Sequence, residues 1–162
     1  MDARVIMPLY GDLKMRDKLE YVTNYSVPVG WRSQYCGLFK TERNGVTYYF
    51  LDNEYYFKRR GLYGFYDDGE RFAFFSRAVL ETLFYIDFTP DIINCNDWQT
   101  ALVPVYLNLY YRHLDKETGS RPSSPSTTSP IRASTAPTFW RTPAASAAVT
   151  STSWSTMAVP TS

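Results

Sequence analysis

Residues 91–107, DIINCNDWQTALVPVYL, decide the fold class of this chain. The run from Asp91 to Cys95 is short and contains the apolar residues Ile92, Ile93 and Cys95, which is typical of a buried strand. A helical pattern follows from Trp98 to about Arg112, with Leu102 and Val105 on one face. A strand, a polar turn and a helix in this order predict an α/β fold.

The polar residues at the end of this strand outnumber what a turn needs: they are Asn94, Asn96, Asp97 and Gln99. In open α/β sheets, ligands bind outside the carboxyl ends of the strands. Asp97 can cap the following helix, because Asp is a preferred capping residue and its carboxylate suits the helix dipole. It can also hydrogen-bond the hydroxyls of a sugar or nucleotide, and both roles can coexist. Trp98 can cover the sheet or wall a pocket against a sugar ring.

The residues upstream predict a β-meander over residues 21–51, preceded by a strand over residues 4–10. Asn44-Gly45 lies between two β-rich runs, residues 36–42 and 46–51. Asn-Gly in this setting is the strongest short-range signal for a hairpin, because both residues tolerate positive φ.

A tyrosine-rich irregular stretch over residues 52–68 separates the meander from a second helix. That helix can start at Asp68 or Gly69, since Phe72, Phe75, Val79 and Leu83 fall close to helical spacing. Aromatic residues default to the core, but an irregular loop rich in tyrosine also suits carbohydrate contact.

Composition excludes several classes of function. The net charge of +1 gives no electrostatic argument for nucleic-acid or membrane partners. No stretch approaches the roughly 18 apolar residues of a membrane span, and the amino terminus lacks the apolar core of a signal peptide. Cys36 and Cys95 are far apart and form no metal spacing, so we expect no metal and a reduced, cytoplasmic chain. No Walker A, GxSxG or GxGxxG motif is present.

The composition changes near residue 117, which predicts two regions, 1–117 and 118–162. No acidic residue follows Glu117, and Ser, Thr, Pro and Ala dominate the remainder. Few large apolar residues remain there to offset chain entropy, so we expect a disordered, low-complexity tail.

Three segments carry a resemblance to a known family: LDNEYYFKR (51–59), GLYGFYDDGERFAFFSRA (61–78) and NDWQTALVP (96–104). In this order and spacing they resemble bacterial glycogen synthase and starch synthase over about residues 2–115. The resemblance implies a partial Rossmann-like N-terminal, acceptor-side domain of a GT-B glycosyltransferase, with the β-meander as an insertion. It further implies transfer of glucose from ADP-glucose to the non-reducing end of an α-1,4-glucan (glycogen) with retention, using neither cofactor nor metal.

The resemblance also implies site residues. Asp97 and Trp98 match the family's Asp-Trp pair near the transferred glucose, while Gln99 replaces the usual histidine and retains hydrogen bonding without proton transfer. Phe57 occupies a region where relatives use an aromatic ring to contact glucan. The expected cleft residues are Asn96, Asp97, Trp98, Gln99, Asp52, Asn53, Phe57 and Arg59.

The family begins with a strand and a Lys-x-Gly-Gly-Leu loop and ends with a second, nucleotide-binding domain. This sequence matches neither, so we expect no complete catalytic set in the chain and no activity of the chain alone, because cations for the leaving diphosphate are missing. The alternative hypothesis is a non-catalytic carbohydrate-binding module that uses the tyrosine-rich loop.

A frameshift hypothesis explains the tail. In the neighbouring reading frame, residues 121–136 can encode a segment similar to the family's continuation. Trp140 then forces Leu, and Met157-Ala158 forces Gly, which both fit family-like segments. Residues from about Thr118 onward are then out-of-frame translation without selected function.

Overall fold

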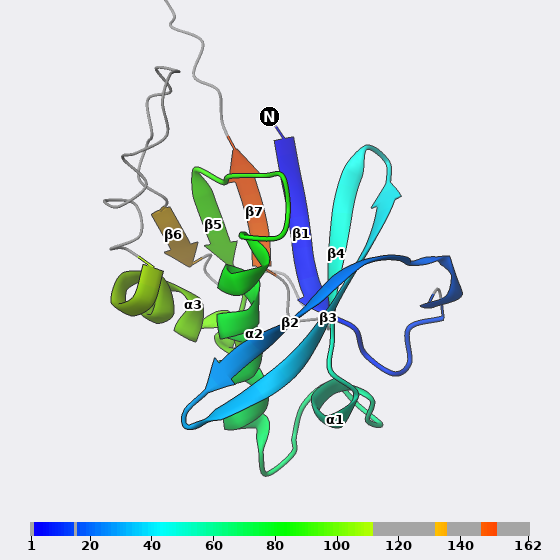
Figure 1. Cartoon of the computed structure of the whole chain (residues 1–162), viewed down its shortest axis with the longest axis vertical. Helices are drawn as coiled ribbons and strands as arrows, with labels where there is room; N and C mark the ends of the chain where they lie inside the picture. The colour runs from blue at the N-terminus through cyan, green and yellow to red at the C-terminus, as the bar shows by residue number, and fades with distance from the viewer. Residues whose placement is uncertain (1, 15, 112–131, 136–146, 152–162) are drawn as a thin grey trace, which may run out of the picture.

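The structure is a computed structural model that describes residues 2–14, 16–111, 132–135 and 147–151. Within them, strands form one sheet in the order β2-β3-β4-β1-β7-β5-β6, and helix α2 packs against one face (Figure 1). The strands are β1 (Asp2–Pro8), β2 (Glu20–Val29), β3 (Arg32–Arg43), β4 (Val46–Asp52), β5 (Ile92–Cys95), β6 (Arg132–Thr135) and β7 (Ala147–Ser151). The helices are α1 (Glu54–Phe57), α2 (Asp68–Thr82) and α3 (Leu102–Tyr106), with short turns η1 (Arg16–Lys18), η2 (Trp98–Thr100) and the π-helical η3 (Leu107–Tyr111).

The predicted meander is confirmed: β2, β3 and β4 are consecutive antiparallel neighbours. Asn44 and Gly45 connect β3 to β4 with φ values of 53° and 74°. Two successive residues with positive φ define the turn whose twist matches that of the flanking strands. The α/β class is also confirmed, but the tyrosine-rich stretch contains a short helix, α1, that its irregular composition does not indicate.

Strand direction brings three strand ends to one edge of the sheet. β4 runs parallel to β1, and β7 runs antiparallel to both β1 and β5. Hence β1, β4 and β5 point the same way, and their carboxyl ends share an edge. That edge is where ligands bind in open α/β sheets.

Two segments depart from the disordered tail that composition predicts. Residues Arg132–Thr135 pair in parallel with β5, and Ala147–Ser151 lies between β1 and β5 (Figure 1). A strand at the side of a sheet presents unpaired N–H and C=O groups along its length. These groups can hydrogen-bond to the backbone of another strand whatever its side chains, so a Ser/Thr-rich composition does not prevent pairing. The other residues of 118–162 lie outside the described part of the chain.

The helix predicted from Trp98 to Arg112 is divided into η2, α3 and η3, and Arg112 lies outside the described residues. Pro104 explains the first division. It has no N–H to donate to the carbonyl of Thr100, so the turn of η2 cannot continue as one α-helix.

Helix α2 and the meander share the core. The α2 residues predicted to face inward are buried, with Leu83 partly so: they include Phe72, Phe75 and Val79. Across the interface, the Tyr25 hydroxyl donates to the Ala78 carbonyl at 3.1 Å, and its oxygen lies 2.6 Å from the Thr82 hydroxyl. These contacts fix α2 against β2.

Arg71 on α2 is fully buried and joins three segments. Its Nε donates to the carbonyl of Tyr56 at 2.7 Å, one Nη donates to Asp68, and the other donates to the carbonyl of Leu62 at 3.4 Å. The guanidinium also lies against aromatic rings, including that of Phe65 at 4.8 Å. Arg71 therefore holds α1, the loop after it and the start of α2 together.

Replacing Arg71 with Met should lower the free energy of unfolding by about 3–5 kcal/mol, because the change removes the cation paired with the partly buried Asp68 and the donor to the carbonyls of Tyr56 and Leu62. Urea unfolding of the full chain measures this. Arg60→Met is the matched control at an exposed position and should change stability by less than about 0.5 kcal/mol. A loss at Arg71 as small as that at Arg60 would show that the buried network contributes little.

Candidate functional site

Asp97 directly follows β5 in a backbone conformation that is normally reserved for glycine. Its φ is 66° and its ψ is 174°. Its Oδ1 accepts a hydrogen bond from the Trp98 N–H at 2.7 Å, so Asp97 caps η2, and its side chain is exposed. This backbone region costs on the order of 1–3 kcal/mol for a residue with a side chain, and such strain concentrates at functional sites. The strand end therefore holds a carboxylate at the surface at an energetic cost.

The residues around Asp97 form a tight hydrogen-bonded turn. The Thr100 hydroxyl donates to the Asn96 carbonyl at 2.8 Å, and the Asn94 amide donates to the Asn96 Oδ1 at 3.1 Å. The side chain of Gln99 is turned inward and only 5% exposed, and its Oε1 has no hydrogen-bond partner among the described residues. Asn96 therefore accepts hydrogen bonds within the turn and the side chain of Gln99 is buried, while the side chain of Asp97 is exposed to solvent.

Trp98 is half-exposed and forms an aromatic wall beside Asp97. Its ring packs edge-on against Phe72 of α2, with centroids 5.0 Å apart, and against Tyr63, with centroids 6.4 Å apart. One part of the ring covers Phe72 of α2, and 49% of the residue remains exposed. Contact of this exposed part with a sugar ring stays a prediction.

A second group lies at the end of β4. Asp52 forms an ion pair with Arg16 at 2.7 Å, and Arg16 also lies 3.6 Å from Glu54. Burial raises the pKa of Asp52 above its usual value, although the positive charge of Arg16 opposes this. Asp52 shares the sheet edge with Asp97 because β4 and β5 run in the same direction.

Two residues that were predicted to line the cleft, Asn53 and Phe57, have structural roles in this fold. Asn53 is buried and caps α1, accepting from the Tyr56 N–H at 3.1 Å and donating to the Tyr35 carbonyl at 2.8 Å. Phe57, predicted to contact glucan, is fully buried against rings that include Phe74. Its ring faces the core, so this expectation requires correction.

Arg59 forms a two-pronged ion pair with Asp67 at 2.6 and 2.7 Å. The Arg59 hydrogen bond holds the pKa of Asp67 below its usual value. This ion pair joins the two ends of the loop over residues 59–67. Arg59 therefore affects the site indirectly, by stabilising this loop.

The structure adds Tyr63 and Arg16 to the residues found by sequence reasoning. Tyr63 reaches Trp98 across a gap of 35 positions in the chain. Arg16 reaches Asp52 across 36 positions. Neither residue has a local sequence signal for its partner, beyond the fact that Tyr63 belongs to the tyrosine-rich loop.

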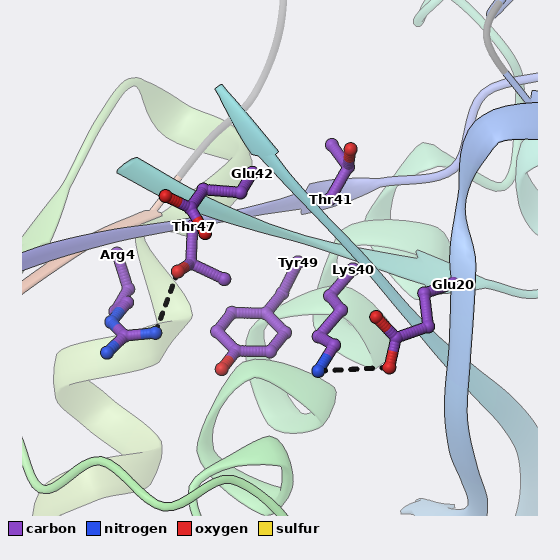
Figure 2. A pocket seen from close by; sticks show the side chains of 7 residues that line it. All are labelled: Arg4, Glu20, Lys40, Thr41, Glu42, Thr47 and Tyr49. Carbon is purple, nitrogen blue, oxygen red and sulfur yellow. Dashed lines mark hydrogen bonds and ion pairs between the residues drawn. The ribbon is translucent and has the colours of Figure 1, made fainter. Parts of the chain in front are cut away.

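A polar cavity of about 290 Å³ lies away from this edge, near the start of β1 and β4 (Figure 2). Some of its polar side chains contact each other: Arg4 donates to Thr47 at 2.8 Å, and Lys40 lies 3.1 Å from Glu20. It belongs to the amino end of the parallel strands, where the fold does not concentrate ligand contacts.

Other site classes find little support in the described part of the chain. There, no three His, Cys, Asp or Glu side chains gather as a potential metal site. Among the same residues, no helix is both long enough and apolar enough to cross a membrane. Cys36 and Cys95 are free and buried, and burial raises the pKa of Cys36 to about 12 and that of Cys95 to about 11.

The strain at Asp97 gives a test by substitution. Asp97→Ala should destabilise the chain by about 1 kcal/mol, because it removes the cap and keeps the strained backbone. Asp97→Gly also removes the cap but relieves the strain, so it should be at least about 1 kcal/mol more stable than the alanine variant. Urea unfolding compares the two. An alanine variant as stable as the glycine variant would contradict a strained Asp97.

Known proteins resemble this chain both in sequence and in structure. Residues 1–121 match the starch synthase catalytic domain family. The chain is 54% identical over 118 residues to the glycogen synthase of Caldicellulosiruptor bescii, covering 72% of this chain and 25% of that protein. It is 59% identical over 116 residues to the glycogen synthase of Clostridium acetobutylicum, covering 70% of this chain and 24% of that protein.

A solved structure is also similar: the catalytic domain of starch synthase IV from Arabidopsis thaliana, bound to ADP and acarbose. It shares 34% sequence identity with a TM-score of 0.55, covering 65% of this chain and 23% of that chain. The chain spans about a quarter of the length of the curated relatives it matches. Because the family match extends over most of the sequence, this chain belongs to the glycogen synthase and starch synthase family.

Proposed function

We propose that this chain supplies the acceptor-side part of an enzyme that transfers glucose from ADP-glucose to the non-reducing end of an α-1,4-glucan, with retention of configuration. The observation that carries the proposal is the exposed, strained carboxylate of Asp97 at the carboxyl end of β5, beside a half-exposed Trp98. The similar starch synthase IV structure, bound to ADP and acarbose, supports a nucleotide and a sugar as the ligand classes.

In this proposal, Asp97 orients a glucosyl unit by accepting hydrogen bonds from its hydroxyls. A carboxylate held by a rigid turn needs no rearrangement when it binds, which is how fixed polar groups favour a transition state. Trp98 supplies an apolar face for the sugar ring. Gln99 has no titratable group, so no proton transfer is assigned to its position.

The finer architecture forms part of the same proposal. We assign the chain to the Rossmann-like N-terminal domain of a GT-B glycosyltransferase, with the β2-β3-β4 meander as an insertion. The parallel β4, β1 and β5, with their polar carboxyl ends on one edge, support it. The reaction as proposed uses no cofactor and no metal. A cytoplasmic location is also proposed, and the two free cysteines suit a reducing compartment.

A chimera tests the activity. Residues 1–115 of this chain replace the matching segment in the glycogen synthase of Clostridium acetobutylicum, and incorporation of glucose from ADP-glucose into glycogen is measured. We expect the chimera to retain transfer, and Asp97→Asn within it to lower kcat by about 100-fold or more, because a neutral amide replaces the fixed carboxylate.

Glu42→Gln is the control, because Glu42 is exposed on β3 and pairs with Thr47 near the start of β4, at the opposite end of the strands from Asp52 and Asp97. It should leave kcat within about twofold. A folded chimera that binds glycogen without transferring glucose would favour the carbohydrate-binding module instead. Full activity of the Asp97→Asn chimera would refute the role of Asp97.

For residues from about 118 onward, we propose out-of-frame translation and therefore no function. The family match, which ends at residue 121, supports this. Sequencing of the coding DNA tests it: we expect the neighbouring frame to stay open and to encode a family-like continuation. Stop codons throughout that frame would refute it.

A further inference from the structure

Strand β7 lies inside the sheet, between β1 and β5 (Figure 1). The other sides of these two strands are already paired, β1 with β4 and β5 with β6. Adjacent strands lie about 4.8 Å apart, so without β7 the backbones of β1 and β5 stand roughly 9–10 Å from each other, too far to hydrogen-bond directly. Removal of β7 therefore opens a gap one strand wide, with unpaired N–H and C=O groups on both sides.

The direction and length of β7 differ from those of the strands around it. It runs antiparallel to both β1 and β5, whereas β4, β1, β5 and β6 all run the same way. It pairs with Asp2 to Ile6 of β1, while Met7 and Pro8 extend past it. The tail segment therefore fills the gap without matching the direction of its neighbours or the full length of β1.

The residues on both sides of the gap are mostly apolar. On the face that packs against α2, Ile6, Ile93 and Cys95 are almost completely buried. On the other face, Val5 and Ile92 are half-buried. A strand with such neighbours on both sides normally consists of large apolar and β-branched residues, which pack well on a pleated surface.

The sequence of β7 (Ala147–Ser151), AAVTS, does not have this character. Ala147 occupies the register position opposite both Ile6 and Cys95. Alanine is depleted in strands, and it has less apolar surface to bury than valine or isoleucine. A segment of larger apolar residues therefore suits the gap better than β7 does.

We infer that β1 and β5 form a strand-binding gap for an extended apolar segment of another polypeptide, and that β7 is a replaceable occupant of this gap. The segment pairs through its backbone with both strands, the mode known as β-augmentation, and places large apolar residues beside Ile6 and Ile93. A sugar or a nucleotide has no row of backbone amide and carbonyl groups, so the gap selects a peptide. This inference goes beyond the proposed function and does not rest on it.

Hydrogen exchange of the full chain, followed by mass spectrometry, tests the gap with the peptide Lys-Ile-Val-Ile-Val-Ile-Lys as the probe. With the peptide bound, exchange in residues 147–151 should rise, because β7 is displaced. Exchange in residues 2–6 and 92–95 should stay slow, because the peptide replaces the hydrogen bonds of β7. Residues 37–40 of β3, which pair with β2 and β4, are the internal reference and should not change.

A matched peptide with proline at its centre, Lys-Ile-Val-Pro-Val-Ile-Lys, is the control. Proline has no N–H to donate and is excluded from the middle of a sheet. This peptide should therefore bind at least about 10-fold more weakly and leave residues 147–151 protected from exchange.

Val149→Pro weakens the competing strand, because Val149 pairs with Arg4 of β1 and Ile93 of β5. A larger fraction of the chains then has an open gap, so the apparent Kd of the isoleucine peptide should fall by about 10-fold or more. Ser155→Pro lies outside β7 and should leave this Kd within about twofold. Fluorescence anisotropy of the labelled peptide measures both values, and slow exchange in residues 37–40 verifies that each variant is folded.

Three results would overturn the inference: peptide binding that does not raise exchange in residues 147–151, equal binding of the proline peptide, or a Kd that Val149→Pro does not change. A folded Val149→Pro chain that binds no peptide would also overturn it, and a dimer of that variant would assign the gap to a second copy of the chain. The exchange experiment uses the unsubstituted chain, so it decides the question even if Val149→Pro does not fold. The proposed function stands in every case, because the chimera contains only residues 1–115 of this chain.

Discussion

The buried guanidinium of Arg71 is the interaction on which the site depends. Three segments meet at this side chain: α1 through the Tyr56 carbonyl, the tyrosine-rich loop through the Leu62 carbonyl, and the start of α2 through Asp68. The guanidinium presents its donors in a rigid, planar fork and reaches acceptors on separate segments, whereas the compact ammonium of a lysine has three donors on a single nitrogen. A buried charge without partners is costly, so the three segments are held in one arrangement.

The arrangement set by Arg71 extends to the surface. Asp68, which pairs with Arg71, also accepts from the backbone of Gly64 and Phe65 and so fixes the loop that presents Tyr63. On the other side, α2 places Phe72 under Trp98. The aromatic wall is therefore a consequence of how α2 and the loop are joined, while the position of Asp97 comes from the sheet through β5.

The candidate site divides into residues that face a ligand and residues that support them. Asp97 and Trp98 are exposed at the strand end, whereas Gln99, Asn53 and Phe57 are buried. A sequence motif contains residues of both kinds, because the geometry of the site needs the residues that face a ligand and also the buried residues that support them. Burial separates them: Asn53 uses its amide to cap α1, and Phe57 uses its ring to fill the core.

The sequence by itself determined the features that depend on neighbouring residues. Asn44-Gly45 specified the turn of the meander, apolar spacing specified α2, and DIINCNDW specified a strand with a polar end. Local backbone preferences and periodicity are sufficient for these. Only the tertiary structure decided that Tyr63 meets Trp98, that Arg16 meets Asp52, and that a segment of the Ser/Thr-rich tail pairs between β1 and β5. Such contacts close long loops, and their stability comes from packing and pairing that no short stretch of sequence contains.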